Sequence, residues 1–70
     1  MQVYEEGIAR RMTWKSGDEE DIKKALEFFM KVTRQGWLAT VKKDSGYKRV
    51  LEFKPEYLEL WFIPIVEGGL

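Results

Sequence analysis

The 70-residue chain contains no histidine and no cysteine, and it has only two prolines. The first two absences remove the usual general base, the best side-chain nucleophile and the soft ligands of structural zinc. They also exclude disulfides and zinc as the stabilising elements that small domains often use. We therefore expect no enzymatic activity, no cofactor and no metal, and a fold that is held together by packing alone.

Net charge and long apolar runs are missing as well. The 12 basic and 12 acidic side chains balance, so no long-range field draws the protein to phosphate backbones or anionic membranes. The longest apolar run, Leu60–Val66, has seven residues and contains a proline, whereas a membrane span needs about 20. Residues 1–6 lack the basic start and apolar stretch of a signal peptide. The sequence predicts a cytoplasmic protein without membrane contact.

The length of the chain predicts a single domain. A chain this short buries only about 60% of the surface that its unfolded form exposes, which leaves no room for a second core. We expect the domain to span residues 1–66 and residues 67–70 to form a flexible tail with the sequence Glu-Gly-Gly-Leu.

The pattern before residue 36 predicts extended structure followed by one helix. Alternation over Ile8–Trp14 predicts a half-buried strand, and Gly7 marks either a bulge or the turn of a short hairpin, so one or two strands precede the helix. Ser16 and Glu19 match a capping box, and Gly36 matches a helix end, which gives a helix of about residues 17–35. Its apolar stripe consists of Ile22, Ala25, Leu26, Phe29, Val32 and Thr33.

The second half of the chain predicts three further strands. Trp37–Val41 and Tyr47–Phe53 flank a short polar segment with a glycine, which is typical of a hairpin with a bulged or three-residue turn. Pro55 ends the second run because proline has no N–H to donate, and extended structure resumes at residue 57 or 58.

The last strand is apolar on both faces, which indicates a central strand or one face used for binding. One helix covers only one face of a sheet, so one set of side chains should lie on the uncovered face and bind a partner. Our candidates for this partner-binding set are Trp61, Ile63 and Ile65. In the opposite assignment these three are core and the outward set is Leu58, Leu60 and Phe62.

The segment Glu59–Gly69 resembles the last strand and tail of ubiquitin-like sulfur carriers and prokaryotic ubiquitin-like modifiers. Those proteins close with an apolar strand, a proline, a small or branched apolar residue and Gly-Gly. The resemblance covers this segment by motif and the rest by architecture only. It implies an α+β fold: a single small β-grasp-like domain with a mixed sheet of about four strands packed on one helix, and with the C-terminal strand inside the sheet.

The resemblance also implies where the chemistry occurs. A separate ATP-dependent activating enzyme would adenylate the Gly69 carboxylate and pass it on as a thioester or thiocarboxylate. Gly68 and Gly69 suit a narrow enzyme channel because they have no Cβ and adopt backbone angles closed to other residues. Leu70 comes after them, so the resemblance implies a tail-trimming peptidase that removes Leu70. An ordinary frayed chain end is the competing interpretation.

Two other functions stay open. One is a structural or protein-interaction module that uses an exposed apolar sheet face, including for self-association. The other is a single-stranded nucleic-acid-binding module in which aromatic side chains stack on bases. Its phosphate contacts would be Lys42, Lys43, Lys48, Arg49 and Lys54. Zero net charge weighs against it, as does the simpler role of aromatics in filling a small core.

Overall fold

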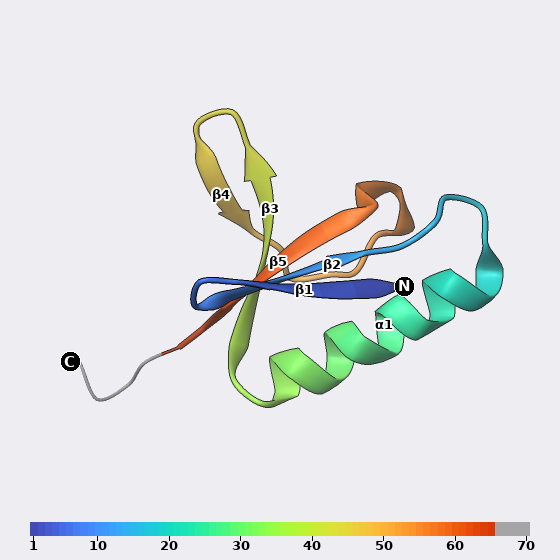
Figure 1. Cartoon of the computed structure of the whole chain (residues 1–70), viewed down its shortest axis with the longest axis horizontal. Helices are drawn as coiled ribbons and strands as arrows, with labels where there is room; N and C mark the ends of the chain where they lie inside the picture. Colours follow the sequence, from blue (N-terminus) through green and yellow to red (C-terminus); the bar gives the residue numbers. More distant parts are fainter. Residues whose placement is uncertain (66–70) are drawn as a thin grey trace.

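The structure, a computed structural model, describes residues 1–65, which form a five-stranded sheet packed on one helix (Figure 1). The elements are β1 (Gln2–Glu6), β2 (Ala9–Thr13), α1 (Glu19–Arg34), β3 (Trp37–Lys43), β4 (Gly46–Arg49), the 3-10 helix η1 (Pro55–Tyr57) and β5 (Glu59–Pro64). Across the sheet the strand order is β1-β2-β5-β3-β4. The predicted α+β class, the single helix and the interior position of the C-terminal strand are confirmed for the described part of the chain.

The predicted mixed sheet of about four strands is wrong in both respects. All four neighbouring pairs, β1/β2, β2/β5, β5/β3 and β3/β4, are antiparallel. β2 and β3 run in the same direction, because both are antiparallel to β5, but β5 lies between them and they do not pair. The parallel ladder that a mixed sheet needs is therefore absent from residues 1–65, and a β-grasp fold is not confirmed.

The sequence left open whether one or two strands precede the helix. The structure has two, β1 and β2, which form a hairpin. The chain turns between Glu6 and Ala9, which pair with each other. Gly7 has a φ of +64°, a left-handed conformation that glycine adopts without steric cost. Ile8 lies in this turn and is 75% exposed, so it is not the start of the half-buried strand that its alternation indicated.

The helix is shorter than the predicted residues 17–35, and its cap is Asp18 rather than Ser16. The Asp18 carboxylate accepts the backbone N–H of Asp21 at 3.1 Å. Gly17 has a φ of +76°, which is not a helical angle, so the helix cannot begin at Ser16. Acidic residues fill its first turn, and Lys31 and Arg34 lie in its last, as the helix dipole favours. No helix within residues 1–65 has the length and apolarity to cross a membrane.

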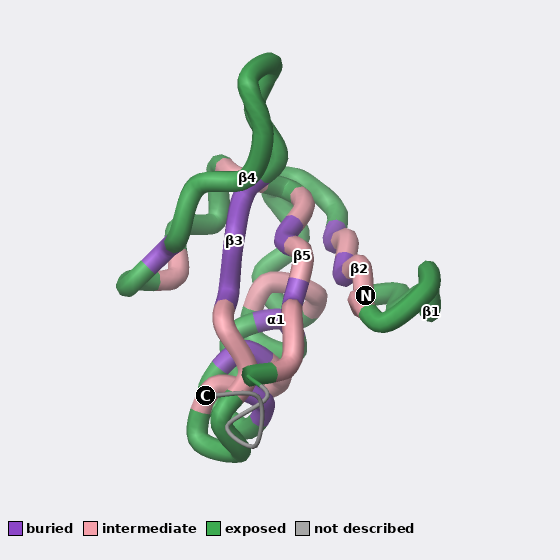
Figure 2. The backbone as a smooth tube through the Cα atoms, turned by 90° about the vertical axis from the view of Figure 1, so that its left-hand side faces the viewer, coloured by how far each residue is buried: buried purple, intermediate pink, exposed green. Residues whose placement is uncertain are grey.

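The core lies between α1 and the three central strands. Figure 2 shows buried segments on β2, β3, β5 and α1, whereas β1 is exposed along its length. Leu60 and Phe62 are fully buried, and the Phe62 ring lies 5.6 Å from the ring of Phe28 on the helix. The even-numbered residues of β5 therefore face α1, and Trp61 and Ile63 face away from it. The other buried apolar residues are Met12, Trp14, Ala25, Phe29, Val32, Ala39, Val41 and Val50.

Two leucines depart from the predicted core. Leu58 precedes β5 with a φ of +63° and is 41% exposed, because it ends the 3-10 helix instead of extending the strand. Leu26 is 38% exposed, since the buried face of α1 centres on Ala25, Phe29 and Val32. The spacing of apolar residues in the sequence predicts that both leucines face the core, and the structure shows that they do not.

The segment after β4 closes one end of the core. β4 ends at Arg49, so the predicted strand Tyr47–Phe53 is too long, although the Val50 N–H still donates to the Ala39 carbonyl at 2.8 Å. Trp14 anchors the segment: its ring lies 5.0 Å from that of Phe53, and its Nε1 donates to the Pro55 carbonyl at 2.9 Å. The β3–β4 turn is tighter than predicted, because Lys43 pairs directly with Gly46.

We predict that Leu60→Ala lowers the free energy of unfolding by about 2–5 kcal/mol, because it leaves a cavity at a fully buried position. Leu26→Ala, at a position already 38% exposed, should cost clearly less. Urea unfolding of both variants, followed by circular dichroism, measures the two losses. Equal losses would mean that the helix buries a different face from the one described.

Candidate functional site

The face of the sheet opposite α1 is the open face, and its residues follow from the strand register. Trp61 on β5 lies directly opposite Arg11 on β2 and Thr40 on β3. Directly opposed residues in an antiparallel pair point to the same side of the sheet. Because Trp61 faces away from the helix, its partners do too, and the same step adds Tyr4, which pairs with Arg11, and Arg49, which pairs with Thr40.

Aromatic and cationic side chains contact one another across this face. The Arg11 guanidinium carbon lies 4.4 Å from the centre of the Tyr4 ring and 5.8 Å from that of Trp61. On the other side of Trp61, the Lys42 ammonium is 5.5 Å from the ring centre, and the Tyr47 ring lies 5.8 Å away at 67°. We call these five residues the aromatic row; they lie on five adjacent strands, and Tyr47 is 52% exposed.

Two carboxylates hold the middle of the aromatic row. Arg11 donates to Glu6 at 2.6 Å and to Glu59 at 3.2 Å. The other oxygen of Glu59 accepts the Trp61 Nε1–H at 3.0 Å, so one carboxylate orients both Arg11 and Trp61. The hydrogen bond to Glu6, supported by Glu59, raises the pKa of Arg11, although partial desolvation opposes it. Arg11 therefore stays charged, and the two carboxylates offset its charge.

The three predicted partner-binding residues fall into two regions of the molecule. Trp61 is half-buried within the aromatic row. Ile63 pairs with Leu38 of β3, and both are half-buried, whereas Ile65 follows the end of β5 and is 51% exposed. We call Leu38, Ile63 and Ile65 the apolar end, since it precedes the tail. The tail residues predicted for activation and trimming, Gly68, Gly69 and Leu70, lie outside the described residues, as does the predicted domain boundary at residue 66.

Four of the five predicted phosphate-contacting residues lie on the β3–β4 hairpin, which extends away from the helix (Figures 1 and 2). By register, Lys42 and Arg49 belong to the open face, and Lys43 and Lys48 to its reverse. None of the four forms an ion pair with another residue in 1–65. Lys54 lies apart, just before η1. Tyr4 and Arg11 were not predicted, because their placement depends on β1, whose existence the sequence leaves open.

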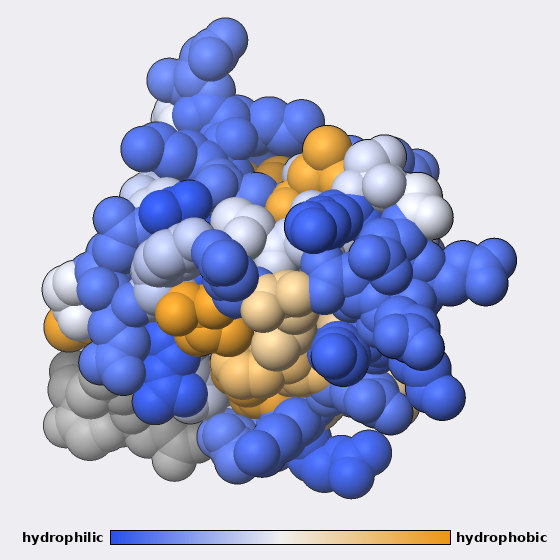
Figure 3. Space-filling model, turned by 45° about the vertical axis from the view of Figure 1, so that its right-hand side comes forward, coloured by the Kyte–Doolittle hydropathy of each residue, from blue (hydrophilic) through white to orange (hydrophobic). Residues whose placement is uncertain are grey.

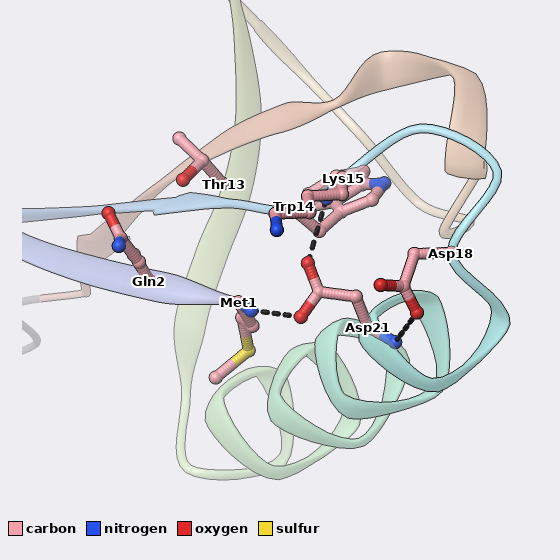
Figure 4. Close-up of a pocket in the computed structure, with 7 residues that line it drawn as sticks. All are labelled: Met1, Gln2, Thr13, Trp14, Lys15, Asp18 and Asp21. Atoms are coloured by element: carbon pink, nitrogen blue, oxygen red, sulfur yellow. Dashed lines mark hydrogen bonds and ion pairs between the residues drawn. The ribbon is translucent and has the colours of Figure 1, made fainter.

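A hollow of about 440 Å³ lies beside the start of α1 (Figure 4). Asp21 accepts hydrogen bonds there from the Met1 ammonium group and, at 2.8 Å, from the Lys15 backbone N–H. The ammonium group, followed by the Lys15 N–H, lowers the pKa of Asp21 below its ordinary value of 3.8. The Asp21 carboxylate is thus occupied by the protein's own groups. The arrangement fastens the residue before β1 and the segment after β2 to the helix, so we regard this hollow as structural.

Figure 3 shows a side of the molecule where apolar surface forms a patch framed by hydrophilic side chains. Several large apolar side chains outside the open face are also partly exposed, including Val3 on β1 and Leu26 and Met30 on α1. These side chains carry no charge and no hydrogen-bonding group that would select a partner. The open face, with its ordered aromatic and cationic contacts, is the stronger candidate site.

Comparison with known proteins returned no match: the chain resembles no protein-family model, no curated protein and no solved structure at a significant level.

Asp21 gives a prediction about acid sensitivity. Because folding lowers its pKa, its stabilising contribution is complete well above pH 3.8 and is lost as pH falls through the folded-state value. Asp21→Asn should therefore destabilise the protein at pH 7, and the gap to the wild type should close in strong acid. Urea unfolding across this pH range measures the gap.

Glu20→Gln is the matched control for Asp21→Asn. It removes the same charge from the same helical turn, but Glu20 forms no ion pair with another residue in the described part of the chain. If both variants lose the same stability at pH 7, Asp21 acts only through the helix dipole and the fastening role is wrong.

Proposed function

We propose that the protein is a ubiquitin-like modifier or sulfur carrier in the cytoplasm. A separate ATP-dependent enzyme would activate its Gly69 carboxylate after a peptidase has removed Leu70. The observation that carries the proposal is the position of β5, which is bonded to β2 on one side and β3 on the other. The Gly-Gly sequence comes shortly after the central strand of the sheet, which is paired on both sides, so the domain would hold the base of the tail in a fixed position.

A β-grasp-like assignment of the domain is part of this proposal. Its support is the element order of two strands, a helix, two strands and a final strand that enters the middle of the sheet. The antiparallel ladders depart from the mixed sheet that the assignment implied. The carrier function depends on β5 and the tail and does not depend on how β1 and β2 are ordered.

The proposed activation requires no catalytic side chain from this protein. The Gly69 carboxylate would attack the α-phosphate of ATP and release pyrophosphate, and a sulfur nucleophile would then displace AMP from the acyl adenylate. Every group that moves a proton or binds the nucleotide would belong to the activating enzyme. This chain contributes a carboxylate on two residues without Cβ atoms, which pass through a narrow channel.

The length of the tail limits where the enzyme docks. Gly69 is the fourth residue after Ile65. An extended chain spans at most about 3.6 Å per residue, so the carboxylate reaches no further than about 14 Å from Ile65. An enzyme that holds Gly69 in its active site is therefore in contact with the end of β5. The apolar end, with Ile65 51% exposed, supplies a docking surface there.

We predict that the protein isolated from its native host lacks Leu70, or carries sulfur or a second protein on Gly69. Intact mass spectrometry distinguishes these forms from the unprocessed chain. Gly69→Ala should abolish the adducts, because the added Cβ blocks entry to the enzyme channel. Unfolding temperatures should match the wild type, since the change lies beyond the sheet. A chain that keeps Leu70 and carries no adduct contradicts the proposal and favours an interaction module instead.

The docking surface has its own test. Ile65→Ala should reduce the yield of the Gly69 adduct, because it removes exposed apolar surface next to the tail. Leu51→Ala is the control, since Leu51 is 77% exposed and lies in the segment after β4. If both variants form as much adduct as the wild type, the enzyme does not use the apolar end.

A further inference from the structure

We propose that the aromatic row and the β3–β4 hairpin together bind single-stranded nucleic acid. This goes beyond the proposed carrier function and is independent of it, because the tail takes no part. Two features coincide on the open face. One is a pair of aromatic rings, of which Tyr47 is exposed and Trp61 is half-buried. The other is the positive charge of Lys42 and Arg49, which form no ion pair within residues 1–65.

The first feature is the pair of rings formed by Trp61 and Tyr47. The two rings meet edge to face with their centres 5.8 Å apart. Tyr47 is 52% exposed and is not among the described residues that pack against the core. Glu59 fixes the Trp61 indole through its Nε1, and Lys42 contacts the same ring. Rings that are held in place lose little conformational freedom when a base stacks on them, and unpaired bases of any sequence offer a flat π surface.

The second feature is a gradient of charge along the aromatic row. At the β1–β2 side, Glu6 and Glu59 offset Arg11. At the β3–β4 side, residues 42–49 hold four cationic side chains, Lys42, Lys43, Lys48 and Arg49, against one acidic residue, Asp44. These cations form no ion pair within residues 1–65. Of the four, Lys42 and Arg49 lie on the open face next to Tyr47 and Trp61, where a backbone of phosphates would pass, whereas Lys43 and Lys48 lie on the reverse side of the hairpin.

Charge and stacking together favour a nucleic acid over an acidic peptide. An acidic peptide would use the cations but would leave the faces of the rings exposed. A duplex would also use the cations, but its bases are already stacked and cannot reach the rings. A single strand uses both features. Zero net charge does not oppose this, because binding at short range depends on the local patch and not on the whole-protein field.

The test measures fluorescence anisotropy of labelled oligomers of deoxyuridine and of uridine, each about 12 nucleotides long, in about 50 mM salt. The two probes differ only in the 2′-hydroxyl, so they separate DNA from RNA as the ligand. We expect saturable binding of at least one probe, and binding of a duplex of equal length that is weaker by about tenfold or more. No saturable binding of either probe overturns the proposal.

Variants of Tyr47 separate stacking from charge. Tyr47→Ala should weaken binding about fivefold or more, whereas Tyr47→Phe keeps the ring and should stay within about twofold of the wild type. Both changes lie at an exposed position, and circular dichroism verifies the fold. If the two variants bind equally well, the ring takes no part and the proposal is wrong.

Variants of the cations test the phosphate contact. Lys42→Gln should lower the slope of log K against log salt by about 0.7, the value expected for one lost phosphate contact on a single strand. Lys31→Gln, an exposed lysine on α1, should leave the slope unchanged. Displacement of the probe by polyglutamate at equal charge concentration would overturn the proposal in favour of an acidic-peptide site. Gly69→Ala, which blocks the carrier function, should bind the probe like the wild type.

Discussion

The fold depends on β5 filling the space between β2 and β3. The helix connects these two strands so that they run in the same direction without pairing. Within residues 1–65, β5 is the only strand that hydrogen-bonds to both hairpins of the sheet. Leu60 and Phe62 on that strand are fully buried against the helix side, so the ladder and the core are completed by the same six residues, Glu59–Pro64. The sheet is not complete until the chain has contributed its final strand, which makes its key contacts non-local in sequence.

This constraint explains why β5 is apolar on both faces. Its even-numbered residues build the core, and its odd-numbered residues form the open face, where one helix cannot reach. Glu59 interrupts the apolar pattern because its carboxylate receives the Arg11 guanidinium and the Trp61 indole N–H. A residue that looks like an exception in the sequence is the one that orders the aromatic row.

Strong local signals predicted much of this fold. The helix, the β3–β4 hairpin and the central position of β5 follow from periodicity, a glycine turn and an unusually apolar strand. β1 was left open because all five of its residues are exposed, so no burial pattern marks it. The number of strands and the mixed character of the sheet were mispredicted, because they depend on which distant strands pair, and the spacing of residues in the sequence does not record that. Leu26 and Leu58 were mispredicted for local reasons: Leu26 lies beside the buried face of α1, and Leu58 ends the 3-10 helix instead of continuing β5.

The candidate site, like the fold, was predicted where local sequence patterns define it and missed where distant strands bring residues together. Alternation placed Trp61 and Ile63 on one side of β5, and the burial of Leu60 and Phe62 shows that this side faces away from the helix. Tyr4 and Arg11 escaped prediction, because they join Trp61 only through the β1–β2 and β2–β5 registers. Composition revealed the basic hairpin, but only the structure shows that Lys42 contacts the Trp61 ring while Lys43 belongs to the reverse side.

The two proposed activities occupy different parts of one strand and are physically compatible. Ile65 follows Trp61 by four residues, which corresponds to about 13 Å along an extended chain. A nucleic acid stacked at Trp61 and Tyr47 would lie toward β4, where the cations are, whereas an enzyme holding Gly69 would contact the end of β5 near Ile65. A nucleic acid bound at Trp61 and Tyr47 therefore leaves the end of β5 accessible to the enzyme. Such binding would localise the protein and its tail on the nucleic acid without competing with activation.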